Sequence, residues 1–267
     1  MISPPKASSG SYISQLNFKL KRILKKMIPA DRQLIRTGEY FLTHGEREVH
    51  LLPQWIKPGT TAIDVGSHIG DYTYAICKYL GASGKVIAIE PQPRLANELS
   101  KATKKLGMPV TVYNCALSSK DGEAELVVPL DKGIVSPGLA TLEPRTGEIV
   151  DSYRVPLRRL DDVCRDVTGP ISFMKIDVEG HELEVLKGSR EILTKHYPNL
   201  LIEIENRHTQ KPIAETFEFL FSLGYHCQFL NPAGELVPFS QFTIEKNQSM
   251  NKLGTTEYVS NFIFKKA

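Results

Sequence analysis

Residues 61–90 constrain the fold of this chain more than any other segment. A short apolar run ends in Asp64, glycines follow at Gly66 and Gly70, and after a helical pattern a second apolar run ends in Glu90. A strand, a glycine turn, a helix and a strand with a terminal acid are typical of a nucleotide-binding crossover unit. A dinucleotide site needs G-x-G-x-x-G around a pyrophosphate, whereas this turn reads G-x-x-x-G. The looser turn therefore favours a ligand without phosphates.

Composition predicts one α/β domain with a basic tail. The chain has 267 residues and 41% apolar content, enough to bury a single large core. Its net charge is +3, and the first 30 residues hold six basic side chains and no acid, which leaves −3 for the remainder. An acidic body argues against a nucleic-acid partner, because phosphate contacts need Lys and Arg. The four scattered cysteines fit a reducing, cytoplasmic location.

The tail, residues 1–36, contains a predicted amphipathic helix. Within residues 17–28, apolar side chains recur at helical spacing and Lys or Arg fills most other positions, until Pro29 ends the pattern. Such a helix could contact an anionic membrane surface, which would place the protein at the inner membrane face. It could equally cap the body or pack in a homodimer. Both alternatives are open.

The second part, residues 37–267, alternates strands and helices and predicts a mainly parallel sheet covered on both faces. Strands are expected at 61–65, 85–90, 110–114, 124–128, 154–157, 172–177 and 199–205, and, near the C-terminus, at 225–230 and 258–265. Helices are expected at 71–81, 92–106, 182–195 and 213–223. The hairpin-like ending indicates an antiparallel edge strand. A loop at 131–141 is expected to lie over the site, where a lid could form.

Five sequence blocks resemble FkbM-type methyltransferases, in the order that the family has them. They are DVGSHIGDYT at 64–73, EPQP at 90–93, NCALS at 114–118, LRRLDDV at 157–163 and MKIDVEGHELEVLKG at 174–188. The resemblance covers about residues 60–265. It implies a Rossmann-like class I methyltransferase fold of seven strands with the last one reversed, S-adenosylmethionine as methyl donor, and a hydroxyl acceptor. The chain carries His68 where the family usually has Asn.

The cofactor is expected at the carboxyl ends of the first strands. Asp64 could accept from the cofactor's ammonium or hold the loop shut, and Gly66 and Gly70 let the backbone approach the ligand. Glu90 can accept from both ribose hydroxyls. Asn114 could pair with the adenine edge or satisfy local backbone groups. The predicted cofactor-binding residues are Asp64, Gly66, Ser67, His68, Gly70, Glu90, Pro91, Asn114, Ala116 and Asp177.

Catalysis is expected near Asp177, which follows a buried strand and should face the transferred methyl group. A sugar hydroxyl is a poor nucleophile, so a general base is expected, either His208 or Asp177, with His208 the better proton acceptor near neutral pH. Glu205 and Asn206 end the next strand, and with Asp177 they could form an oxygen-rich Mg²⁺ site. Alternatively these three side chains bond the acceptor or one another.

The sequence therefore predicts an S-adenosylmethionine-dependent O-methyltransferase that acts on a hydroxyl of a carbohydrate or glycolipid, with a small-molecule or glycan acceptor as partner. N-methylation or methylation of another small molecule is the enzymatic alternative. A scaffold that binds S-adenosylmethionine without catalysis is the non-enzymatic one.

Overall fold

A mixed eight-stranded sheet forms the centre of the computed structural model, which describes residues 28–131, 134–143, 149–209 and 211–266. Its strand order is β11-β10-β12-β9-β8-β1-β2-β3. Five strands run parallel, namely β1 (Thr61–Val65), β2 (Lys85–Ile89), β3 (Val110–Tyr113), β8 (Ile171–Ile176) and β9 (Asn199–Glu203). The antiparallel part consists of β12 (Asn261–Lys266), β10 (Tyr225–Leu230) and β11 (Leu236–Pro238).

The predicted α/β class with a mostly parallel sheet is confirmed, but two details differ. The sheet has eight strands rather than seven, because the three-residue strand β11 was too short to be recognised from its pattern. The reversed strand β12 lies inside the sheet between β9 and β10, and β11 forms the antiparallel edge. Strand order depends on pairing between distant segments, which periodicity does not encode.

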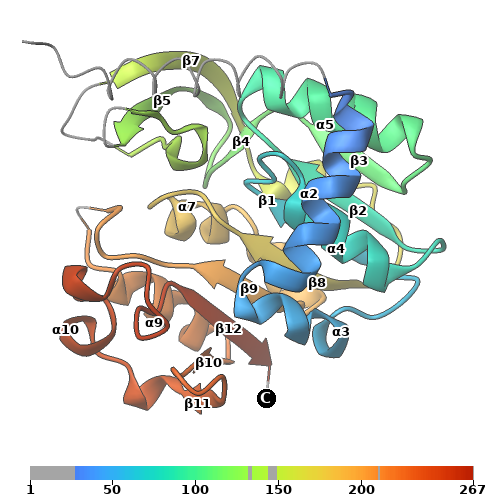
Figure 1. Ribbon diagram of the computed structural model, residues 1–267. Coiled ribbons are helices and arrows are strands. Elements are labelled where there is room, and N and C mark those ends of the chain that lie inside the picture. Colours follow the sequence, from blue (N-terminus) through green and yellow to red (C-terminus); the bar gives the residue numbers. More distant parts are fainter. Residues whose placement is uncertain (1–27, 132–133, 144–148, 210, 267) are drawn as a thin grey trace, which may run out of the picture.

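Helices cover both faces of this sheet (Figure 1). One face carries α2 (Ala30–His44), α3 (Leu52–Trp55), α4 (Asp71–Leu80) and α5 (Pro93–Lys105). The other carries α6 (Leu160–Val163), α7 (Glu182–Lys187), α8 (Arg190–Lys195) and α9 (Ala214–Ser222). Shorter helical turns are η1 (Arg47–Leu51), η2 (Pro137–Leu139), η3 (Phe239–Gln241), α10 (Ile244–Asn247) and η4 (Met250–Lys252).

The single helix expected over 182–195 is two helices, α7 and α8, separated at Gly188 and Ser189. A Cβ on Gly188 would lie 2.1 Å from the carbonyl oxygen of Ser118. The backbone at Ser118 thus passes directly over Gly188, and the missing side chain of this glycine allows the close approach.

A second, four-stranded sheet stands apart from the main one above α7 (Figure 1). Its order is β4-β7-β5-β6, from β4 (Ala116–Leu117), β5 (Gly122–Asp131), β6 (Ile134–Val135) and β7 (Ile149–Arg158). The strands expected at 124–128 and 154–157 lie here, as an antiparallel pair, and not in the parallel sheet. One side of the pair is solvated, with Glu123 and Arg154 exposed, and the other buries Leu126 and Val155. That alternation is typical of a half-exposed antiparallel ribbon.

Helix α2 joins the N-terminal segment to the body. Its Leu34 is buried in one cluster with Tyr74 of α4 and Leu99 of α5. The domain boundary expected between residues 36 and 37 therefore falls inside a packed helix. The basic helix expected at 17–28 lies outside the described residues except for its last position. Within the ranges that the structure describes, no helix is long and apolar enough to cross a bilayer.

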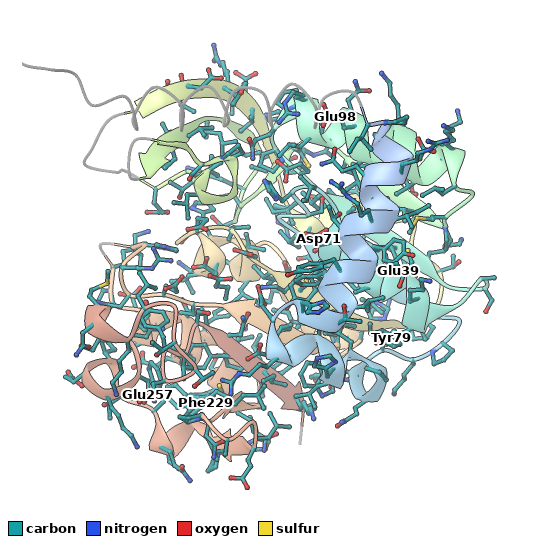
Figure 2. The ribbon with its side chains drawn as sticks, viewed as in Figure 1. Glu39, Asp71, Tyr79, Glu98, Phe229 and Glu257 are labelled. Carbon is teal, nitrogen blue, oxygen red and sulfur yellow. The ribbon has the colours of Figure 1, made fainter. Side chains whose placement is uncertain are left out.

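Aromatic side chains fill the C-terminal end of the core. The ring of Phe217 on α9 lies 4.4 Å from that of Phe239 and 4.9 Å from that of Phe262, centroid to centroid. Phe229, labelled in Figure 2, joins this cluster from β10. Offset and edge-on aromatic pairs stabilise a fold by more than their buried area alone. This cluster therefore holds α9 against β10 and β12 at the C-terminal part of the sheet.

Candidate functional site

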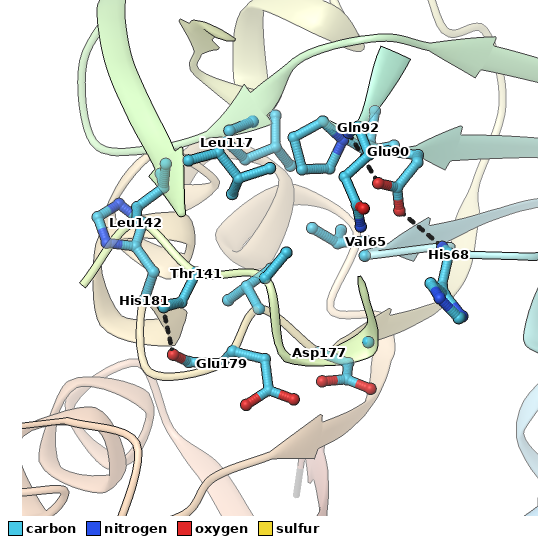
Figure 3. Close-up of a pocket in the computed structure, with 18 of the residues that line it drawn as sticks. Val65, His68, Glu90, Gln92, Leu117, Thr141, Leu142, Asp177, Glu179 and His181 are labelled. Carbon is cyan, nitrogen blue, oxygen red and sulfur yellow. Dashed lines mark hydrogen bonds between the residues drawn. The ribbon is translucent and has the colours of Figure 1, made fainter. Parts of the chain in front are cut away.

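A cavity of about 140 Å³ opens at the carboxyl ends of β1, β2 and β8 (Figure 3). This is the edge of an open α/β sheet where ligands are expected. Of the predicted cofactor residues, six line it: Gly66, His68, Glu90, Pro91, Ala116 and Asp177. Asp64, Ser67, Gly70 and Asn114 are not part of the lining.

The two glycines of the loop, Gly66 and Gly70, are required for different steric reasons. Gly66 has φ +82°, and a Cβ there would lie 1.8 Å from the carbonyl oxygen of Asp177, so the two strand ends meet without space for a side chain. Gly70 has φ +94° and faces away from the cavity, where a Cβ would lie 2.5 Å from Leu99. Gly66 therefore allows the end of β1 to lie against the end of β8 beside the cavity, whereas Gly70 allows α4 to pack on its neighbours.

Glu90 is the most firmly positioned acid of the cavity. Its carboxylate accepts hydrogen bonds from the backbone N–H of His68 at 2.7 Å and of Gln92 at 2.8 Å. Burial raises its pKa to about 7, against the lowering effect of these two bonds. The side chain is fixed before any ligand binds. Because the backbone N–H of residue 68 makes the contact, the positioning of Glu90 does not depend on the side chain of His68.

Asp64 is buried beneath the loop, where it accepts a hydrogen bond from the hydroxyl of Thr73 on α4. Burial raises its pKa to about 6, and the Thr73 bond and the charge of Lys175 oppose that rise. Of the two roles predicted for Asp64, the geometry favours holding the loop to the helix.

We expect Thr73→Val to destabilise the protein by about 1–3 kcal/mol, because the isosteric side chain leaves a buried carboxylate without its hydroxyl donor. Urea unfolding at pH 7.5 measures the difference. Thr73→Ser keeps the hydroxyl and is expected to lose much less. Equal losses in both variants would mean that the methyl group, and not the hydrogen bond, matters at this position.

Asn114 supports the site from outside. Its side-chain amide donates to the carbonyl oxygens of Glu90 at 2.9 Å and Pro91 at 3.0 Å. The alternative in which Asn114 satisfies local backbone groups therefore agrees with the structure, and Asn114 fixes the turn that carries Glu90. Ala116, Leu117 and Cys115 supply an apolar wall next to it.

Asp177 lies at the floor of the cavity with its side chain 32% exposed. Burial raises its pKa to about 6, and Lys175 is the strongest opposing influence. The Nζ atom of Lys175 lies 3.9 Å from the Asp177 carboxylate and 3.4 Å from Oδ1 of Asn261. Lys175 is itself 1% exposed and lies over the ring of Tyr72. A lysine at this position of a strand can pair with a nearby carboxylate, and Asp177 is that carboxylate.

Four carboxylates surround this buried lysine. Burial would lower the pKa of Lys175, but Asp177, Glu46, Glu203 and Asp64 outweigh that effect and raise it. The Glu46 carboxylate also accepts from the hydroxyl of Tyr72 at 2.6 Å and from Asn261 at 2.9 Å. The cluster is a buried, charged network under the floor of the cavity.

His208 does not line the cavity. Its Nδ1 lies 2.6 Å from the carboxylate of Glu179, which does line it, and its Nε2 is buried without a hydrogen-bond partner in the described part of the chain. Glu179 adopts φ +56°, a conformation that residues other than glycine rarely adopt. Glu179 therefore stands between the predicted base and any substrate, and Asp177 has the direct access that His208 lacks.

Glu205, one of the three side chains predicted to bind Mg²⁺, is engaged by donors of the protein itself. Both oxygens of Glu205 accept from the guanidinium of Arg207 at 2.7 Å, and Tyr258 donates to the same carboxylate. Burial alone would raise the pKa of Glu205, but these hydrogen bonds and one with Glu203 outweigh that effect and lower the pKa to about 2. Asn206 is exposed. Across the described ranges, no three His, Cys, Asp or Glu side chains are arranged to hold a metal ion, so Glu205 serves an internal ion pair.

The segment 136–143 lines the cavity, as expected for the later part of the loop at 131–141, whereas 134–135 form strand β6. Thr141 and Leu142 face the cavity from it, and Gln92 donates to the carbonyl oxygen of Pro137 at 2.9 Å. His181 also lines the cavity, with Glu143 at 2.7 Å from its Nδ1. Sequence reasoning missed Gln92 and Thr141, because side chains that gather through loops leave no periodic signal.

The family model described as Methyltransferase FkbM domain matches residues 64–227. The chain belongs to the FkbM methyltransferase family. The match runs from Asp64 through the small sheet to β10, and therefore contains every residue that lines the cavity of this FkbM domain.

Two curated relatives are similar to part of the chain. Methyltransferase sdnD of Sordaria araneosa is 32% identical over 170 residues, covering 53% of this chain and 64% of sdnD. Hexuronic acid methyltransferase AglP of Haloferax volcanii is 30% identical over 156 residues, covering 56% of this chain and 58% of AglP. The chain thus spans less than two thirds of the length of either relative. Methyltransferase FkbM of Methylobacillus flagellatus KT, a solved structure, is 16% identical with a TM-score of 0.49, covering 89% of this chain and 55% of that one.

The residues of the FkbM cavity fit S-adenosylmethionine. Glu90 presents a pre-positioned carboxylate, Gly66 lines the cavity with backbone atoms alone, and Ala116 and Leu117 form an apolar wall. Asp177 and Glu179 add acidic groups to the same cavity, which complement the positive charges of a sulfonium and an ammonium.

Proposed function

We propose that this protein is an S-adenosylmethionine-dependent O-methyltransferase that modifies a hydroxyl group of a carbohydrate or glycolipid. The observation that carries the proposal is the cavity of an FkbM domain in which the fixed Glu90 and the partly exposed Asp177 face the same space. Glu90 would hold the ribose, Gly66 and His68 would flank the methionine part, and Ala116 would contact the adenine.

Asp177 is the group that we propose as general base. When bound, S-adenosylmethionine supplies a methyl group attached to a positively charged sulfur; the nucleophile takes the methyl group, and the sulfur leaves as a neutral thioether. The protein's task is to align the acceptor hydroxyl and to take up its proton. Asp177 can do both, because its carboxylate is exposed to the cavity and its pKa of about 6 leaves it ionised at neutral pH. His208 would act only through Glu179, as the buried partner of that carboxylate.

Two observations support a carbohydrate acceptor. A relative named for hexuronic acid methylation supports it, and so does the number of carboxylates in the cavity, since carboxylates accept hydrogen bonds from hydroxyl groups. Contact with a membrane through residues 17–28, a homodimer and a cytoplasmic location stay predictions.

Release of S-adenosylhomocysteine by the purified full chain tests the proposal, with a panel of monosaccharides, nucleotide sugars and lipid-linked glycans, each with and without Mg²⁺. Turnover on a hydroxyl acceptor is expected without added metal. Binding of S-adenosylmethionine without turnover on any member of the panel would contradict the carbohydrate assignment. Absence of cofactor binding in calorimetry would contradict methyl transfer altogether.

We expect Glu90→Gln to weaken S-adenosylmethionine binding about 10- to 50-fold, equivalent to about 1.4–2.3 kcal/mol. An amide has only one acceptor oxygen. Its NH2 group would therefore face one of the two backbone N–H groups, donor against donor, and one hydrogen bond to the ribose would also be lost. Because the pKa of Glu90 is about 7 and the carboxylate is the acceptor, the affinity of the native protein should increase as pH rises through 7. Calorimetry between pH 6 and 8 measures both effects. Glu98→Gln, on the exposed side of α5, is the control.

A further inference from the structure

The cavity offers many hydrogen-bond acceptors and few donors. Three carboxylates line it, those of Glu90, Asp177 and Glu179. S-adenosylmethionine has one negative group, the carboxylate of its methionine part, and this group needs a donor. Among the described residues that line the cavity, four side chains carry an N–H or O–H group: His68, Gln92, Thr141 and His181.

Three of these four side chains are engaged by the protein itself. Gln92 at 2.9 Å and Thr141 at 2.7 Å each donate to a backbone carbonyl oxygen. His181 has a partner at each ring nitrogen, Glu143 at Nδ1 and Ser118 at Nε2. The amide of Gln92 keeps a second N–H, but this residue lies beside the acid that is proposed to hold the ribose (Figure 3).

The backbone donors of the loop after β1 are engaged as well. The N–H groups of Gly66 and Ser67 both donate to the carbonyl oxygen of Ile89, at 3.0 Å each. The N–H of His68 donates to Glu90 at 2.7 Å. In contrast, the imidazole of His68 makes no hydrogen bond within the described part of the chain. It is therefore the side chain of this loop that is available to a ligand.

His68 adopts a left-handed backbone conformation at the edge of the cavity, with φ +47°. Histidine is one of the few residues other than glycine that are found there repeatedly. Figure 3 shows its ring pointing away from Glu90, toward the level of Asp177. Burial lowers the pKa of His68, while Asp71 and Arg94 act on it with opposite signs. The imidazole is thus neutral near pH 7.5 and has one N–H to donate.

We propose that the imidazole of His68 binds the carboxylate of the cofactor's methionine part, and that it selects ligands with this carboxylate over nucleosides that lack it. His68 then has two separate functions. Its backbone N–H positions Glu90 for the ribose, and its ring binds the other end of the cofactor. This inference rests on the proposed function, in particular on the ribose lying at Glu90.

The test compares two ligands that differ only in this carboxylate, S-adenosylmethionine and decarboxylated S-adenosylmethionine, by calorimetry of the full chain at pH 7.5. The native protein should bind S-adenosylmethionine at least about tenfold more tightly, because a hydrogen bond to a charged group is lost with the carboxylate. His68→Gly should reduce this preference to below about threefold by weakening the binding of S-adenosylmethionine alone. Glycine removes the donor, tolerates the positive φ and keeps the backbone N–H that holds Glu90.

Two further variants separate the donor from the shape of the side chain. His68→Phe keeps a ring without an N–H, so it should lose the preference as His68→Gly does. His68→Gln restores a side-chain N–H and should recover part of the preference. Glu90→Gln is the matched control. It should weaken both ligands by a similar factor and leave the preference unchanged, because both carry the ribose.

Equal binding of the two ligands by the native protein would overturn the inference while the methyltransferase proposal stands. An unchanged preference in His68→Gly or His68→Phe would do the same, since another donor would then hold the carboxylate. If the native protein binds neither ligand, the proposed function itself is wrong.

Discussion

Asp177→Asn is expected to lower turnover by roughly 10²- to 10⁴-fold, the usual contribution of a general base. Asparagine keeps the shape and a hydrogen-bonding oxygen but cannot take up the acceptor's proton. The pH profile adds a second signature. Burial raises the pKa of Asp177 to about 6, so turnover of the native protein should increase as pH rises through 6 and the carboxylate ionises. This acidic limb should be absent from the residual activity of the variant.

Initial rates of S-adenosylhomocysteine release between pH 5 and 9 measure both effects, with cofactor affinity determined separately by calorimetry. Affinity should change by only a few-fold, because Glu90 holds the cofactor on the other side of the cavity. Asp166→Asn, at an exposed position, serves as control. A tenfold or smaller loss in Asp177→Asn, with the acidic limb intact, would assign the base to another group.

Lys175→Met is expected to destabilise the protein by about 3–5 kcal/mol at pH 8, the typical result of removing one partner from a buried ionic group. Methionine fills a similar volume but leaves Asp64, Asp177 and Glu203 without the cation that they share. Burial already raises the pKa of Asp64 and of Asp177 to about 6, and that of Glu203 well above its ordinary value.

The sign of the pH dependence follows from these raised values. An acid whose pKa is higher in the folded state binds more protons there, so stability falls as pH rises from about 4 through 6. Without Lys175 these pKa values rise further, so the deficit of Lys175→Met should be smaller at pH 5 than at pH 8.

Urea unfolding at both pH values measures the deficit. The control is Lys78→Met, because Lys78 pairs with Glu39 at 2.8 Å on the surface, with both side chains about half exposed. Exposed pairs contribute about 0–1 kcal/mol. A Lys175→Met variant as stable as this control at pH 8 would show that the carboxylates do not depend on the buried lysine.

Much of the main sheet could be predicted from the sequence, because its signals are local. The run at Lys85–Ile89 is continuous and apolar, as buried parallel strands are, and Gly66 and Glu90 follow from the spacing of a crossover unit. The hairpin of β5 and β7 was recognised as two strands but assigned to the wrong sheet, since alternation does not reveal the pairing partner.

The candidate site was less predictable, because most of its contacts join distant residues. That Tyr258 donates to Glu205, beside the local partner Arg207, depends on the loop before β12. The distance between His208 and the cavity depends on the turn at Glu179 and Gly180. Thr73 gave no signal of the hydrogen bond by which it holds Asp64, whereas one of the two roles predicted for Asn114, bonding to backbone groups, agrees with its contacts to Glu90 and Pro91.

The separate pairing of the small sheet has a consequence for how such a protein can diverge. Strands β5, β6 and β7 pair with one another and with β4, and in the described residues none of them pairs with a strand of the main sheet. A residue inserted into this hairpin shifts only the register of the hairpin, whereas one inserted into β1 or β8 would displace Gly66 or Asp177. The segment 136–143 can therefore lengthen or shorten without shifting β1 or β8, provided that the hydrogen bonds from Gln92 to Pro137 and from Thr141 to Glu179 are kept or replaced. For protein engineering, the hairpin and these two anchoring contacts form one unit that must be exchanged together.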